Sequence, residues 1–120
     1  MATFTKKILS GSTDGKAIKV AQTATAGTTI HTGSTTTTTL DEVWLYAVNT
    51  SASNVKLTIE WGEATAPDGN IELSVVAESG LVLVVPGLLI KGNATALVVK
   101  AFAATANVIC IHGYVNQITV

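Results

Sequence analysis

Cys110 and His112 are the residues whose types and spacing come closest to a metal site. They stand two positions apart, so on a β-strand their side chains point to the same face. His31 would supply a third ligand, but structural zinc takes four, and a carboxylate would have to come from elsewhere in the chain. We therefore expect a buried thiol and a hydrogen-bonded imidazole at these positions, and we expect no metal ion and no cofactor.

The carboxylates form no pair suited to acid–base chemistry. Asp41 and Glu42 are adjacent and would face opposite sides of a strand, while Glu60 and Glu63 flank a turn. Glycoside hydrolysis needs two carboxyl groups on either side of one bond. These acids are therefore expected at the solvated rim of the fold.

The serines and histidines also lack a catalytic pattern. Residues 11–15 read GSTDG, which places the serine outside the Gly-x-Ser-x-Gly pattern of hydrolases. A small enzyme would need His31, His112 and a carboxylate to meet in one cleft, and this alternative stays open. The sequence predicts that the chain is not an enzyme and has no catalytic residues.

The charge balance disfavours a nucleic-acid partner. All seven basic residues are lysines, and the formal net charge is −1. Phosphate neutralisation needs clustered basic residues, and base recognition relies heavily on arginine. A chain with 12% charged residues and a net charge near zero also has little self-repulsion, so we expect it to associate.

No stretch of the sequence predicts a membrane segment. Residues 81–90 form the longest apolar run, which is far shorter than the roughly 20 residues that span a bilayer. Residues 1–7 contain no apolar run, so we expect no signal peptide. We therefore expect a soluble protein without a membrane partner.

The elements that position these residues are expected to be strands. Thr, Val and Ile make up 42 of the 120 residues, and β-branched side chains favour pleated sheet. Turn signals recur about every ten residues, which is typical of a sandwich or barrel. We predict an all-β fold: a single-domain antiparallel β-sandwich over residues 1–120 with about nine or ten short strands, for which a jelly roll is one candidate. The predicted strands are Thr3–Leu9, Lys16–Thr25, Thr28–Thr32, Glu42–Thr50, Asn54–Trp61, Asn70–Ala77, Leu81–Val85, Leu88–Lys91, Thr95–Ala103 and Val108–Val115.

Two turn-rich segments carry further expectations. Val85-Pro86-Gly87-Leu88 fits a type II turn, which predicts a corner between the two sheets. The threonine run Thr35–Thr39 has high β-propensity but no alternation, so its register is weakly specified. We interpret this run as a flexible loop, or as an edge arm that orders against a neighbouring subunit.

The predicted strand Glu42–Thr50 is apolar on both faces and must therefore be covered on both. Trp44, Tyr46 and Val48 share one face, and in a two-layer domain their cover is either a loop or another molecule. We take these three residues, with Thr35, Thr36 and Thr37, as the candidate interface with sister subunits. Tyr46 and Tyr114 would form a sugar-stacking surface only if both faced solvent.

The chain resembles the decoration (cement) proteins of tailed-bacteriophage heads. The resemblance rests on the Thr/Ala/Val-rich composition, the Thr35–Thr39 run, the strand series from Val43 to Val115 and the missing catalytic set. The resemblance implies a structural virion protein, made in the host cytoplasm, that binds the major capsid protein on the outer capsid surface. It also implies a homo-oligomer, with a homotrimer favoured. The absence of arginine is a departure that implies apolar and backbone contacts in place of salt bridges.

Two further functions fit the same features. One is a carbohydrate- or receptor-binding β-sandwich module of a viral spike or fibre. The other is a structural protein of a phage tail or neck.

Overall fold

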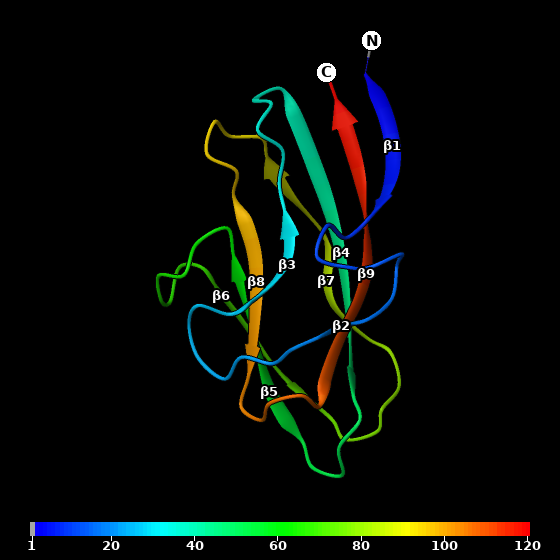
Figure 1. Cartoon of the computed structure of the whole chain (residues 1–120), viewed down its shortest axis with the longest axis vertical. Coiled ribbons are helices and arrows are strands. Elements are labelled where there is room, and N and C mark those ends of the chain that lie inside the picture. Colours follow the sequence, from blue (N-terminus) through cyan, green and yellow to red (C-terminus); the bar gives the residue numbers. More distant parts are fainter. Residues whose placement is uncertain (1) are drawn as a thin grey trace.

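Residues 2–120 are described by a computed structural model, and they form nine strands in two antiparallel sheets (Figure 1). No helix within these residues is long and apolar enough to cross a membrane. The strands are β1 (Thr3–Ile8), β2 (Ile18–Lys19), β3 (Thr28–Thr32), β4 (Thr39–Asn49), β5 (Val55–Trp61), β6 (Asn70–Val75), β7 (Val82–Lys91), β8 (Val98–Ala103) and β9 (Ile109–Thr119).

The strand order is that of a jelly roll. Sheet A has the order β1-β9-β4-β7, with β2 also paired to β9, and sheet B has the order β3-β8-β5-β6. The strands pair as in one long hairpin that is rolled up into two layers. The nested pairs, from the outermost inward along the chain, are β1–β9, β3–β8, β4–β7 and β5–β6. The predicted single-domain β-sandwich is confirmed.

Strand β4 runs through the middle of sheet A and shows why these sequences form strands. Its side chains alternate strictly between buried and half-buried from Thr39 to Asn49. Val43, Leu45 and Ala47 point inward and are fully buried, as the period-two pattern predicts. Inward side chains of both sheets build the core: Leu9, Ile18, Val20, Ile30, Val43, Leu45, Ala47, Val55, Leu57, Ile59, Val75, Val85, Ile90, Val99, Ala101, Ala103, Ile109, Ile111 and Val115.

The expected corner at Pro86-Gly87 is wrong, because both residues lie inside β7. This strand is an edge of sheet A, where a proline need not donate a ladder hydrogen bond. The register to β4 shifts at this point, so that Trp44 pairs with Pro86 and Val43 with Leu88. Gly87 is the extra residue of a β-bulge, and its φ of 78° is one that glycine adopts without steric cost.

The predicted strand Lys16–Thr25 is largely absent, since only Ile18–Lys19 forms a strand. The chain leaves sheet A here and crosses to sheet B, where the amide of Ala103 donates to the carbonyl of Gln22. In Figure 1 this blue segment runs from β2 across β8 to β3. The crossing takes the backbone out of the ladder, which the local β-propensity could not reveal.

The threonine run forms a loop that joins β3 of sheet B to β4 of sheet A. Its first four residues are exposed, whereas Thr39 is buried as the first residue of β4. The amide of Thr39 donates to the carbonyl of Thr36, which closes a turn directly before the strand.

Candidate functional site: the outer face of sheet A

The outer face of sheet A is the surface that faces away from sheet B. The pairing registers and the burial alternation of β4 identify the side chains that point to this side. They are Phe4, Lys6 and Ile8 of β1; Cys110, His112, Tyr114, Asn116 and Ile118 of β9; Leu40, Glu42, Trp44, Tyr46 and Val48 of β4; and Leu83, Pro86, Leu89 and Lys91 of β7. Most of these side chains are apolar or aromatic.

Two aromatic rings occupy the centre of this face. Trp44 and Tyr114 are direct partners across β4 and β9, their ring centroids lie 6.1 Å apart, and their planes differ by 10°. The Lys6 ammonium lies 4.9 Å from the centroid of the Tyr114 ring, a cation–π contact. The aromatic centre therefore spans three neighbouring strands.

Gly87 makes room for the Trp44 indole. A Cβ atom at position 87 would lie 2.9 Å from Cε2 and Cζ2 of Trp44, which is closer than real Cβ contacts. The indole therefore packs over the backbone of β7 at its bulge. Neither the pairing nor this contact is visible in the sequence, because residues 44 and 87 lie in segments that local patterns do not connect.

Glu42 is the carboxylate of this face, and its oxygen Oε1 accepts two side-chain hydrogen bonds. Trp44 Nε1 donates at 2.7 Å and Asn116 Nδ2 donates at 2.9 Å. The hydrogen bond from Trp44, followed by that from Asn116, lowers the pKa of the Glu42 carboxyl from its ordinary value. The charge is thus held in place beside the aromatic rings.

Exposed aliphatic and aromatic side chains continue the face to both edges of the sheet. Phe4 is 72% exposed and Ile8 52% on β1, while Leu83 is 47% and Leu89 51% exposed on β7. Four strands about 4.8 Å apart and up to eleven residues long give this face a plan area of roughly 600 Å². That size approaches the roughly 800 Å² that each partner contributes to a standard protein interface.

Sheet B differs because the chain covers part of its outer face. Thr58 and Glu60 point to that side of β5, yet each is only 2% exposed. The loop between β2 and β3 lies over them: the Gly27 amide donates to Glu60 Oε1 at 2.7 Å, and the Thr25 hydroxyl donates to Glu60 Oε2. The expectation that Glu60 lies at the solvated rim is therefore wrong.

The predicted interface residues separate into two groups. Trp44, Tyr46 and Val48 lie together, half-buried, on the outer face of sheet A. Thr35, Thr36 and Thr37 lie in the exposed loop at one end of the sandwich. Tyr46 and Tyr114 are both half-exposed on the same face, as a sugar-stacking surface would require.

His31 is buried in a polar cluster between the sheets. Its Nε2 lies 2.8 Å from Asp41 Oδ2, and the Ser10 amide donates to its Nδ1 at 3.1 Å. The second oxygen of Asp41 accepts from Gln117 Nε2 at 2.9 Å. Because the Ser10 amide occupies the Nδ1 lone pair, Nε2 carries the proton and donates to Asp41, so neither ring nitrogen is free to act as a base. Asp41 is 2% exposed, which corrects its expected place at the rim.

The three possible metal ligands do not meet. Cys110 and His112 share the outer face of sheet A, opposite Val48 and Tyr46, as their spacing predicted. Both are half-exposed, however, so the expected buried thiol is wrong. His31 lies inside the sandwich, and within residues 2–120 no group of three or more His, Cys, Asp or Glu side chains could hold a metal ion.

Two pockets lie outside this face. One, of about 340 Å³, is lined by Glu60, Lys100 and apolar side chains of the loop before β8. The other, of about 610 Å³, opens above the His31–Asp41 pair at the end of the sandwich and is lined largely by hydroxyl groups. The polar atoms of Asp41, His31 and Glu60 already have partners from the chain itself.

No protein family model, no curated protein and no solved structure matches this chain. The candidate site is therefore assigned from its own chemistry: a broad apolar sheet face with an aromatic centre and one fixed carboxylate.

Proposed function

We propose that this chain is a structural component of a virus particle, a decoration protein that binds the outer surface of major capsid subunits on a phage head as a homotrimer. The observation that carries the proposal is the open outer face of sheet A. Apolar side chains occur on this face in β1, β9, β4 and β7, whereas the chain's own loop covers the opposite outer face around Thr58 and Glu60.

A surface of this kind favours a protein partner. Contiguous apolar surface is rare on monomeric soluble proteins and marks interaction sites. Each 100 Å² of apolar area removed from water contributes about 2.5 kcal/mol before the costs of association. Repetition over many copies on a particle lets modest contacts add up to tight attachment. The jelly-roll order is compatible with this role, since viral capsid domains and lectins both use it.

Co-sedimentation with purified virus heads that lack this chain tests the proposal. Wild-type protein at micromolar concentration should pellet with the heads and saturate them. Trp44→Ala should weaken binding about thirtyfold, because it removes the centre of the apolar face. Phe102→Ala is the matched control, since Phe102 is a half-buried aromatic residue on the outer face of sheet B. Wild-type protein that stays in the supernatant would refute the proposal.

A second candidate is a glycan-binding module of a viral spike or fibre. The pair of Trp44 and Tyr114 supports it, because parallel aromatic rings with Glu42, Asn116 and Lys6 beside them could stack on a sugar ring and bond its hydroxyl groups. A glycan array distinguishes the two candidates. Binding that is lost in Tyr114→Ala, together with no binding to heads, would favour the glycan module.

A further inference from the structure

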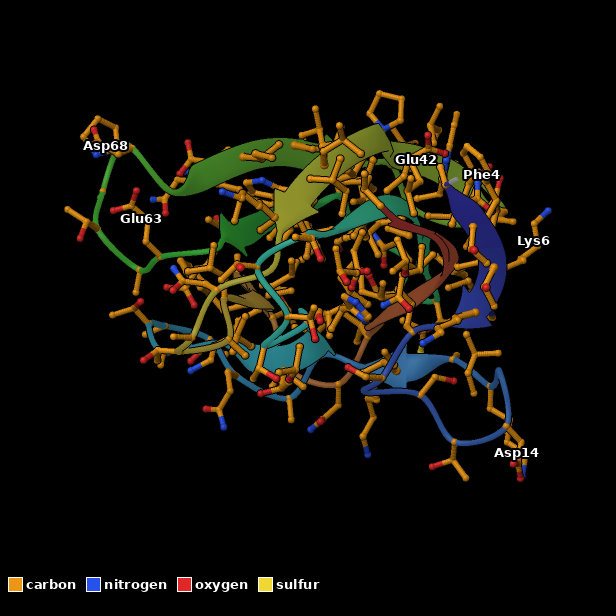
Figure 2. The ribbon with its side chains drawn as sticks, turned by 90° about the horizontal axis from the view of Figure 1, so that it is seen from above. Phe4, Lys6, Asp14, Glu42, Glu63 and Asp68 are labelled. Carbon is orange, nitrogen blue, oxygen red and sulfur yellow. The ribbon has the colours of Figure 1, made fainter. Side chains whose placement is uncertain are left out.

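Nine of the charged side chains lie in two groups, one at β1 and β2 and the other along β6. The β1–β2 side holds four lysines, Lys6, Lys7, Lys16 and Lys19, and one acid, Asp14, for a net charge of +3. Strand β6 and its flanking loops hold four acids, Glu63, Asp68, Glu72 and Glu78. With Lys56, which contacts Glu72, and Lys100, which lines the same pocket as Glu63, this group has a net charge of −2. Figure 2 shows Lys6 at one side of the molecule and Glu63 and Asp68 at the other.

Each of these two sides carries an open and regular strand edge. Within residues 2–120, β1 is bonded to β9 alone and β6 to β5 alone, and both are six residues long with unshifted registers. The other two edge strands are interrupted: β7 contains Pro86 and two register shifts, and β3 contains one shift. Bulges and proline are the usual means by which an edge is protected from further pairing.

We propose that β1 of one copy adds to sheet B of a second copy by pairing antiparallel with its β6. In the full register of two six-residue strands, Lys6 would stand directly opposite Glu72. Glu72 already contacts the Lys56 ammonium through Oε2 at 3.1 Å, which leaves Oε1 for the incoming lysine. Opposite charges in direct cross-strand positions stabilise pairing, whereas like charges oppose it.

The position of the two edges makes this contact head-to-tail. Strands β1 and β6 belong to different sheets, so the contact uses two different surfaces and leaves β6 free on the first copy and β1 free on the second. Such heterologous contacts repeat and close into a ring when the rotation allows. The pairing also places Phe4 and Ile8 at the junction, so that the outer face of sheet A continues up to the next copy.

This inference rests on the proposed function and specifies how sister subunits contact one another. Sedimentation equilibrium of Lys6→Glu and Glu72→Lys tests it, with circular dichroism as the check on folding. Each single reversal places like charges opposite one another and should raise the Kd of self-association about tenfold. The combined variant, with both reversals in one chain, should restore the wild-type Kd, because each β1 again meets an oppositely charged β6. Lys100→Glu, an equal charge change on β8, is the control and should leave the Kd unchanged, because β8 is paired on both sides and lies at neither edge.

The outcomes separate this inference from the proposed function. Folded single variants that associate as the wild type does, or a folded combined variant that stays dissociated, would overturn the β1–β6 contact. Wild-type protein that is monomeric at these concentrations would also overturn it, whether or not that protein binds heads. Failure to bind heads would refute the proposed function whatever the charge variants do.

Discussion

Asp41 shows how single residues secure the inside of the sandwich. Its two carboxylate oxygens accept from His31 and Gln117, and these three residues come from β3, β4 and β9. A buried carboxylate with two donors joins both sheets at one end of the fold. Removal of the acceptor would leave the buried His31 ring N–H without a partner.

We therefore expect Asp41→Ala to lower the free energy of unfolding by about 3 kcal/mol. Urea denaturation followed by circular dichroism measures this loss. Asp68→Ala, at an exposed loop position, is the control and should change stability by no more than about 0.5 kcal/mol. Equal losses in the two variants would show that the His31–Asp41–Gln117 cluster contributes nothing specific.

Glu42 predicts a pH dependence with a definite sign. Its pKa is lowered in the folded chain by hydrogen bonds from Trp44 and then Asn116. Its stabilising contribution is therefore complete above the ordinary glutamate pKa of about 4.3 and is lost as the pH falls through the lowered value. The Tm difference between wild type and Glu42→Gln should be largest near neutral pH and should shrink below about pH 4.

Thermal melts from about pH 6 to about pH 3 measure this difference. Trp44→Phe, which removes the indole N–H, should reduce the difference at neutral pH. A Tm difference between wild type and Glu42→Gln that stays constant over this pH range would contradict the assigned hydrogen bonds.

The stability of strand β7 depends on the glycine at its bulge. Gly87 has a φ of 78° and a Cβ there would meet the Trp44 indole, whereas Gly80 has a φ of 77° and open space around it. Both positions carry the same backbone cost for alanine, about 1 kcal/mol. Only Gly87→Ala also displaces a side chain, so it should lose about 1 kcal/mol more than Gly80→Ala. Urea denaturation followed by circular dichroism checks this, and identical losses would contradict the packing of the indole on β7.

The sequence predicts those elements that are governed by alternation. Strands β4 and β5 follow directly from period-two patterns, and the two-sided apolar character of β4 correctly indicated Trp44, Tyr46 and Val48 as an outward group. The conformation of Gly87 is also the one that a type II turn requires. Gly87 lies inside a strand because β7 pairs with β4. These two strands are far apart in the sequence, so local patterns cannot specify their pairing.

Burial on the outer face of sheet B is the clearest case that local patterns miss. Glu60 alternates with apolar residues in β5 and is typical of a solvent-facing position. It is buried because the loop between β2 and β3 supplies Thr25 and Gly27 as donors. Phe4 and Ile8 are the opposite case: their alternation with Lys6 was present in the sequence, and it would have extended the candidate face to β1.

The molecule as a whole has a well-buried core and one broad apolar face that the chain itself does not cover. The jelly roll buries its core, and its polar inward groups such as Asp41 and Asn49 have partners. The loop between β2 and β3 covers part of the outer face of sheet B, whereas the outer face of sheet A stays open. Lysines lie at β1 and β2, and carboxylates lie along β6. This asymmetry is the physical basis of the proposed assembly.

Binding of the wild-type chain and of Val48→Asp to purified virus heads, measured by co-sedimentation, tests this account most directly. We expect the wild type to saturate the heads at micromolar concentration, and we expect Val48→Asp to raise the Kd for the heads at least about tenfold without unfolding the chain. Val98→Asp, at a half-buried position on the outer face of sheet B, should have no such effect on binding. Wild-type protein that stays in the supernatant, or Val48→Asp that binds the heads as the wild type does, would contradict the account.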